Sequence, residues 1–229
     1  MKVSFNFTED KVRKLIVGLL LAEIILAAIY LANIKLGKPL RPVGNWFDLD
    51  GETSIANWFS ALQIFSVGLV FLIASQFQNY SRSFLTLISS GFIFLSMDEA
   101  VGIHERITEL LKDFTWVPRF EGDHGIWIPI YLTIGLLLTL VSLKQFLRLW
   151  QQYKQGTLLL LIGITIYLIG AVGLEIVSYQ FLRLSTTKVF YYIEVAVEEF
   201  LEMSGMTLIL YGSILTVLYN QKRNLAPLE

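Results

Sequence analysis

Six long apolar segments constrain this chain more than any other feature. They cover residues 15–34, 55–77, 84–103, 126–147, 157–179 and 190–219. About 20 mainly apolar residues are enough for a helix to cross a bilayer. Only helices and closed barrels satisfy all backbone polar groups within hydrocarbon. The sequence therefore predicts an all-α fold, in which residues 1–229 form a single polytopic integral membrane bundle of about six transmembrane helices.

The composition agrees with a membrane protein and excludes several functions. Hydrophobic residues make up 55% of the 229 residues and charged residues only 16%, whereas about 25% of a soluble domain is charged. The net charge is −1 and there is no basic stripe, so a nucleic-acid partner is excluded. Because cysteine is absent, disulfides, thiolate metal sites and cysteine nucleophiles are excluded as well.

An even number of spans places both termini on the same side of the membrane. Lys and Arg are slightly more numerous in the predicted loops on that side, which indicates a cytoplasmic location for both termini. The first span follows Lys11, Arg13 and Lys14, contains Glu23 and lacks a clear small-residue cleavage site. We expect this span to be an uncleaved anchor.

Acidic side chains on separate predicted helices occur at similar depths in the membrane. At about 1.5 Å per residue, Asp98, Glu175 and Glu202 lie roughly 21, 27 and 26 Å from the cytoplasmic ends of their spans. All three therefore approach the outer boundary of a hydrocarbon layer about 30 Å thick. The first predicted outer loop adds three more acids, Asp48, Asp50 and Glu52.

The segment "FLSMDEAVGIHER" ends the third predicted span with four ionisable residues before its final arginine. Asp98 and Glu105 are seven residues apart, so a continuous helix places them on one face, with Gly102 between them. On the same continuous helix, Glu99 and His104 point elsewhere. Ionisable groups within a membrane are costly and indicate a functional site.

A row of glutamates begins the last predicted span. Glu194, Glu198 and Glu202 are spaced four residues apart, and Glu199 lies at the edge of the row. Like charges at this spacing repel each other, so we expect protons, cations or water to neutralise them. We expect Glu194 itself to extend past the membrane into water.

The convergence of these acids predicts a divalent-metal site near the extracytoplasmic boundary. Oxygen-rich ligation favours calcium, manganese, iron or magnesium. Zinc is disfavoured, since two histidines cannot form a three-histidine site. His104 and Glu199 are the candidate catalytic acid–base residues, and the candidate metal ligands are Asp98, Glu105, Glu175, Glu198 and Glu202.

Other residues have structural interpretations. Glu23 is predicted to face a partner helix and to be hydrogen-bonded while protonated. Thr53 or Ser54 is predicted to cap the second span. Gly205 and Gly212, seven residues apart, favour close helix packing. The tryptophans are typical of an interfacial aromatic belt, and this group comprises Trp46, Trp58, Trp116 and Trp127.

Three motifs, "FDLDGETSIANWFS", "FLSMDEAVGIHE" and "VEEFLEMSG", resemble those of a group of uncharacterised multi-pass bacterial membrane proteins, including cyanobacterial ones. This resemblance covers most of the chain and implies a bacterial inner membrane or another energy-transducing membrane. A more distant resemblance is to the alkaline-ceramidase-like superfamily of membrane hydrolases. The acidic segment 46–58 is similar to the calcium segment of that superfamily, and Ser96, Asp98 and His104 offer its zinc-site residue types. Their spacing differs, and "EEFLE" replaces the terminal histidine pair, so no catalytic role is carried over.

Three functions are consistent with the sequence. A metal-dependent enzyme would act on lipid or another membrane-borne substrate, with the cation polarising a carbonyl or phosphoryl group. A divalent-cation or proton-coupled transporter would need polar groups along a path to both sides. A non-catalytic subunit or scaffold would be part of a homo- or hetero-oligomer and hold no metal.

Overall fold

The computed structural model describes residues 8–37, 43–51, 53–76, 81–183 and 188–225. These residues form helices and connecting turns, with no strand among them. Five of the six long helical spans are α1 (Glu9–Lys35), α2 (Ile55–Ala74), α3 (Arg82–Val101), α5 (Trp127–Gln152) and α8 (Lys188–Leu225). The remaining span is composite and consists of α6 (Lys154–Leu168), the π-helix η3 (Ile169–Leu174), α7 (Glu175–Val177) and a second π-helix, η4 (Ser178–Leu182). Short helices in the connections are η1 (Val43–Phe47), α4 (Ile103–Leu111) and η2 (Glu121–Asp123).

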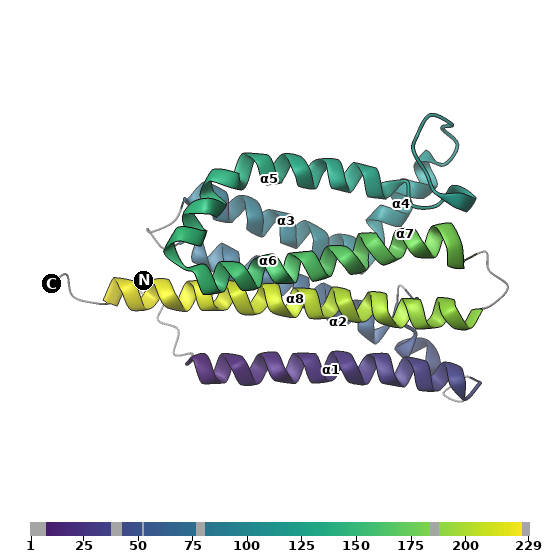
Figure 1. Cartoon of the computed structure of the whole chain (residues 1–229), viewed down its shortest axis with the longest axis horizontal. Helices are drawn as coiled ribbons and strands as arrows, with labels where there is room; N and C mark the ends of the chain where they lie inside the picture. The colour runs from purple at the N-terminus through teal and green to yellow at the C-terminus, as the bar shows by residue number, and fades with distance from the viewer. Residues whose placement is uncertain (1–7, 38–42, 52, 77–80, 184–187, 226–229) are drawn as a thin grey trace.

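Six helical spans are long and apolar enough to cross a membrane, and they follow the order of the six predicted segments. Exposed side chains along α1 and α5 are largely apolar, as lipid-facing surfaces require; Leu21, Ile25 and Val141 are examples. The first residue of α1 and the last residue of α8 lie at the same end of the bundle (Figure 1). Helices α4 and α7, which carry Glu105 and Glu175, lie toward the opposite end (Figure 1).

Helix α8 is the centre of the bundle, with α1 on one side and α6 on the other (Figure 1). In the most apolar 18-residue stretch of α8, 72% of the residues are buried. In the corresponding stretch of α5, only 6% are buried. Helix α5 lies at the edge of the bundle farthest from α1 (Figure 1). The bundle therefore combines a tightly packed core around α8 with one loosely covered side.

Glycines allow α8 and the composite span to approach closely. A Cβ atom at Gly205 would lie 2.6 Å from the backbone nitrogen of Tyr167 and 2.9 Å from the carbonyl oxygen of Gly163. At Gly212, a Cβ would lie 2.7 Å from the carbonyl oxygen of Gly156. The predicted packing role of Gly205 and Gly212 is thus confirmed. Gly170 continues the contact toward the acidic end, where a Cβ would lie 3.0 Å from the carbonyl oxygen of Glu198.

Serine side chains join α2 to α3. The Ser89 hydroxyl donates to the carbonyl oxygen of Gly68 at 2.8 Å, and the Ser96 hydroxyl donates to that of Ala61 at 2.7 Å. Ser96, which matches a zinc-site residue type of the alkaline-ceramidase-like superfamily, therefore belongs to this helix interface. Ser54 caps α2, as predicted, by accepting a hydrogen bond from the backbone nitrogen of Asn57.

Candidate functional site

A cavity of about 690 Å³ lies in the half of the bundle remote from the termini. All seven candidate site residues from the sequence line it: His104, Glu199, Asp98, Glu105, Glu175, Glu198 and Glu202. Asp50 and Glu99 also line the cavity, so eight acids surround it, against two side chains able to carry positive charge, His104 and Arg183. Glu52, which the sequence placed with these acids, lies outside the described residues. The predicted convergence of acids from separate helices is present in the fold.

The cavity has an apolar part that is open toward the outside of the bundle. Helices α3 and α5 line it with Phe94, Ile134 and Leu136, which are 43%, 51% and 60% exposed. Its lining on α5 runs from Trp127 to Thr139, a length of about 18 Å along the helix axis. The cavity therefore joins an acidic end to a groove lined by exposed apolar side chains.

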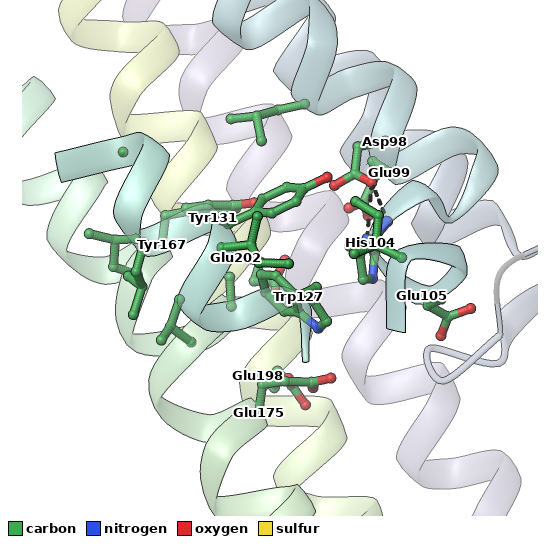
Figure 2. A pocket seen from close by; sticks show the side chains of 18 of the residues that line it. Asp98, Glu99, His104, Glu105, Trp127, Tyr131, Tyr167, Glu175, Glu198 and Glu202 are labelled. Carbon is green, nitrogen blue, oxygen red and sulfur yellow. Dashed lines mark hydrogen bonds and ion pairs between the residues drawn. The ribbon is translucent and has the colours of Figure 1, made fainter. Parts of the chain in front are cut away.

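A left-handed turn at Gly102 builds the polar end of the cavity. Its φ of 61° and ψ of 49° end α3 and begin α4, a conformation that glycine adopts without a Cβ clash. The carboxyl oxygen Oδ1 of Asp98 accepts a hydrogen bond from the backbone nitrogen of His104 at 2.8 Å and lies within hydrogen-bond distance, 3.2 Å, of Nδ1 of the same residue. Figure 2 shows this pair at the cavity wall.

This turn corrects two expectations from the sequence. Asp98 and Glu105 do not share one helical face, because α3 ends at Val101 before Glu105 is reached. Glu105 is exposed and lies apart from the other labelled acids (Figure 2). His104 does not point elsewhere but is paired directly with Asp98, and Glu99 also lines the cavity.

The His104 imidazole is held between a carboxylate and an aromatic ring. Its ring centroid lies 5.1 Å from that of Trp127. Burial alone would lower its pKa, but the hydrogen bond and negative charge of Asp98 outweigh this effect, and the pKa of His104 is raised above 6.5. The phenol of Tyr131 lies beside the carboxyl group of Asp98 (Figure 2).

Glu175 and Glu198 form a second acidic feature of the cavity. Their carboxyl groups lie side by side (Figure 2), one from α7 and one from α8. Glu175 follows the π-helix η3 and precedes the π-helix η4. Such π segments are frequent at functional sites because they shift side chains out of the regular helical pattern. Glu198 is only 7% exposed, so the pair is largely removed from bulk water.

The glutamate row on α8 is more buried than the sequence indicated. Glu194 is 8% exposed rather than extended into water, and its carboxyl group lies beside Ser178 of η4. Glu199 and Glu202 are partly exposed and line the cavity. Together Glu199 and Glu202 place two carboxyl groups along one wall of the cavity.

The loop before α2 contributes a further acid. Asp50 accepts a hydrogen bond from the Tyr191 hydroxyl at 2.8 Å. Burial raises the pKa of Asp50, while the bond from Tyr191 and the charge of Arg183 oppose this shift. The guanidinium of Arg183 also stacks 4.6 Å from the centroid of Tyr179. Asp50 and Arg183 thus belong to one polar network at the end of the cavity.

No group of three or more histidine, aspartate or glutamate side chains within the described ranges is arranged to hold a metal ion. The geometry therefore does not support a metal site built from Asp98, Glu105, Glu175, Glu198 and Glu202 together. Asp98 instead directs one oxygen to His104, and Glu105 lies at the rim. Metal binding stays a prediction.

Sequence reasoning missed several residues of the cavity. Trp127 was assigned to an interfacial belt, but it contacts His104 and lines the cavity, whereas Trp46, Trp58 and Trp116 are exposed as a belt requires. Tyr131, Tyr167 and Arg183 line the cavity too. Tyr131 follows Trp127 by one helical turn, and that i, i+4 aromatic pair was the available signal.

The chain belongs to the family described as Domain of unknown function (DUF8692), which matches residues 16–217. This match agrees with the predicted resemblance to an uncharacterised family. Neither the curated proteins nor the solved structures include a match to the chain.

Proposed function

We propose that this DUF8692 protein is an integral membrane enzyme that acts on an amphipathic, membrane-borne substrate. The observation that supports this proposal most is the continuity of one cavity from an acidic end to an apolar, outward-open groove. The hydrocarbon part of a lipid would lie along α3 and α5, and its polar part would reach Asp98, His104 and Glu198. Substrate would enter sideways from the bilayer without passing through water.

The Asp98–His104 pair is the proposed acid–base device. An ionised carboxylate only accepts hydrogen bonds, so Nδ1 of His104 carries the shared hydrogen. In neutral His104 this leaves the lone pair on Nε2 to accept a proton from a substrate hydroxyl or from water. Asp98 would fix the tautomer and stabilise the imidazolium that forms. Glu199 is a second candidate for proton transfer because it also lines the cavity.

A divalent cation remains part of the proposal, held between Glu175 and Glu198. Magnesium is usually bound by one or two carboxylates and completed by substrate oxygens and water. Such a cation would need no third protein ligand from the described residues. When bound, it would polarise a carbonyl or phosphoryl group of the substrate. The side-by-side carboxyl groups give this idea its physical basis, since a positive charge between them relieves their repulsion.

The test is lipid turnover by the purified full chain. Vesicles would carry a panel of phospholipids, glycolipids and N-acyl lipids, and mass spectrometry would follow loss of substrate and gain of product. Asp98→Asn and His104→Gln should each lower the rate about 100-fold or more, whereas the exposed control Glu121→Gln should leave it unchanged. Chelation, followed by addition of calcium, magnesium, manganese or ferrous iron, tests the cation separately. Equal lipid profiles with wild type and both site variants would contradict the enzyme proposal.

A transporter of cations or protons is the second candidate function. The observation in its favour is a buried polar cluster around Glu23, which lies outside the cavity and farther along the bundle toward the termini. Transport predicts ion flux into protein-loaded vesicles that Glu202→Gln abolishes. Flux without lipid turnover would place this function first.

A further inference from the structure

A second polar site lies on the face of α8 that does not line the cavity. The Glu23 carboxyl on α1 is fully buried, at 0% exposure. Its Oε1 accepts hydrogen bonds from Nε2 of Gln63 on α2 at 2.8 Å and from the Thr207 hydroxyl on α8 at 2.6 Å. Nε2 of Gln63 also donates to the hydroxyl oxygen of Thr207 at 2.7 Å. The sequence prediction that Glu23 faces a partner helix and is hydrogen-bonded is confirmed.

This cluster contains unsatisfied oxygen atoms. Oε2 of Glu23 and Oε1 of Gln63 are buried and make no hydrogen bond with a described residue. No ion pair with Glu23 occurs in the described part of the chain. A carboxylate without a counter-charge is costly within hydrocarbon. The cluster therefore requires positive charge, and a proton is the smallest source of it.

We propose that Glu23, Gln63 and Thr207 form a reversible proton-binding site in the core of the membrane-spanning bundle. Neither Glu23 nor its two partners line the large cavity, so the site is independent of the proposed enzyme function. Its ligand is the proton itself, bound at the Glu23 carboxyl.

The amide of Gln63 makes the site able to hold either protonation state. In the orientation described, Nε2 donates to Glu23, which suits an ionised carboxylate. A half-turn of the amide exchanges its oxygen and nitrogen atoms. Oε1 of Gln63 would then accept the hydrogen of the Glu23 carboxylic acid, and the Thr207 hydroxyl can both donate and accept. The same three side chains therefore serve both states without movement of a helix.

The charged surroundings of the site are simple. The Glu23 carboxyl is hydrogen-bonded by two uncharged side chains, Gln63 and Thr207. Helix α2 carries no titratable side chain. Tyr30 on α1 and Tyr211 on α8 are the neighbouring titratable groups along those helices. Glu202, five residues before Thr207, lines the cavity on a different face of α8. A pH response at this site is thus attributable to Glu23.

Two buried hydroxyl groups lie between the site and the acidic end of the bundle. Ser60 precedes Gln63 by about one turn of α2, and Tyr30 follows Glu23 by about two turns of α1. Both hydroxyl groups are buried and lack a hydrogen-bond partner in the described ranges. Tyr30 packs in the same apolar cluster as Leu49, next to Asp50.

Infrared difference spectroscopy of the full chain in lipid vesicles, between acidic and alkaline pH, tests the proposal. We expect a protonated-carboxyl band that loses intensity as pH rises. The band should be absent from Glu23→Gln, a replacement of nearly equal size, and retained in the exposed control Glu121→Gln. Thermal unfolding of each variant checks that it is folded.

A second variant tests the role of the amide. Gln63→Met keeps the volume but removes the donor to ionised Glu23, so the Glu23 band should persist at pH values where the wild-type band has disappeared. A wild-type protein without a Glu23-dependent band that titrates would overturn the proposal. Loss of the band on addition of sodium at constant pH would overturn it as well, because the ligand would then be a metal cation.

Discussion

The two faces of α8 hold carboxyl groups in opposite ways. On one face, Thr207 and Gln63 enclose Glu23 with hydrogen bonds no longer than 2.8 Å. On the other face, Glu198 and Glu202 border an open cavity, with Glu175 as the neighbour of Glu198. In the first arrangement the protein supplies the hydrogen-bond donors, and the proposed proton is the one addition that the site requires. The second arrangement leaves several carboxyl groups beside an open space, where a molecule or ion from outside the chain has room to bind.

The largest expected effect concerns the close packing that supports both faces. Gly205→Ala would place a Cβ within 3 Å of backbone atoms of α6, which cannot move aside as a flexible side chain can. We expect a loss of about 3 kcal/mol or more in unfolding free energy, measured by denaturation in micelles. The matched control is Gly18→Ala on α1, where nothing lies within 4 Å of the added atom. Similar stability of the two variants would refute the packing described for α6 and α8.

The next largest effect is the difference in stability between variants at the Glu23 site and at Glu198. Thr207→Val keeps the side-chain shape but removes a donor to buried Glu23, so we expect about 2 kcal/mol of destabilisation. Glu198→Gln removes like charge beside Glu175 and should change stability by less than about 0.5 kcal/mol or increase it. The same thermal-unfolding series measures both. A greater loss of unfolding free energy with Glu198→Gln than with Thr207→Val would contradict the described difference between the two faces of α8.

The smallest effect is the pH dependence of the Asp98–His104 pair. Because the pKa of folded His104 is raised above its usual 6.5, the protonated ring stabilises the fold. This contribution is fully present below pH 6.5 and is lost as pH rises through the folded pKa. Asp98→Asn should remove this part of the stability profile, worth about 1 kcal/mol or less. An unchanged profile in the variant would show that Asp98 does not set the pKa of His104.

Much of the fold could be predicted from the sequence because membrane helices carry a strong signal. Apolar length alone indicated the six spans, and helix ends were predicted to within a few residues in most cases. Depth along each helix placed Asp98, Glu175 and Glu202 at a common level, and all three line one cavity. These successes follow from the fixed rise of an α-helix.

The details of the site could not be predicted, because they depend on departures from a regular helix. The spacing argument failed at Gly102, where a left-handed residue turns the chain and brings His104 to Asp98. It also gave no sign of the π-helices on either side of Glu175. The partners of Glu23 come from 40 and 184 residues away, a separation that no local pattern reports.

The central claim is that the cavity receives the hydrocarbon part of a membrane-borne molecule, and photo-crosslinking tests it most directly. Lipids with a diazirine on the acyl chain would be incorporated into vesicles together with the purified protein and then irradiated. Mass spectrometry would identify the labelled residues. We predict labels on cavity residues such as Phe94, Leu95 and Ile164, in addition to labels on outward residues such as Val141. Replacement of Gly91 by a bulky residue should reduce the labelling of the cavity residues. Labels confined to outward residues such as Val141 and Leu21, with none in the cavity, would contradict the account.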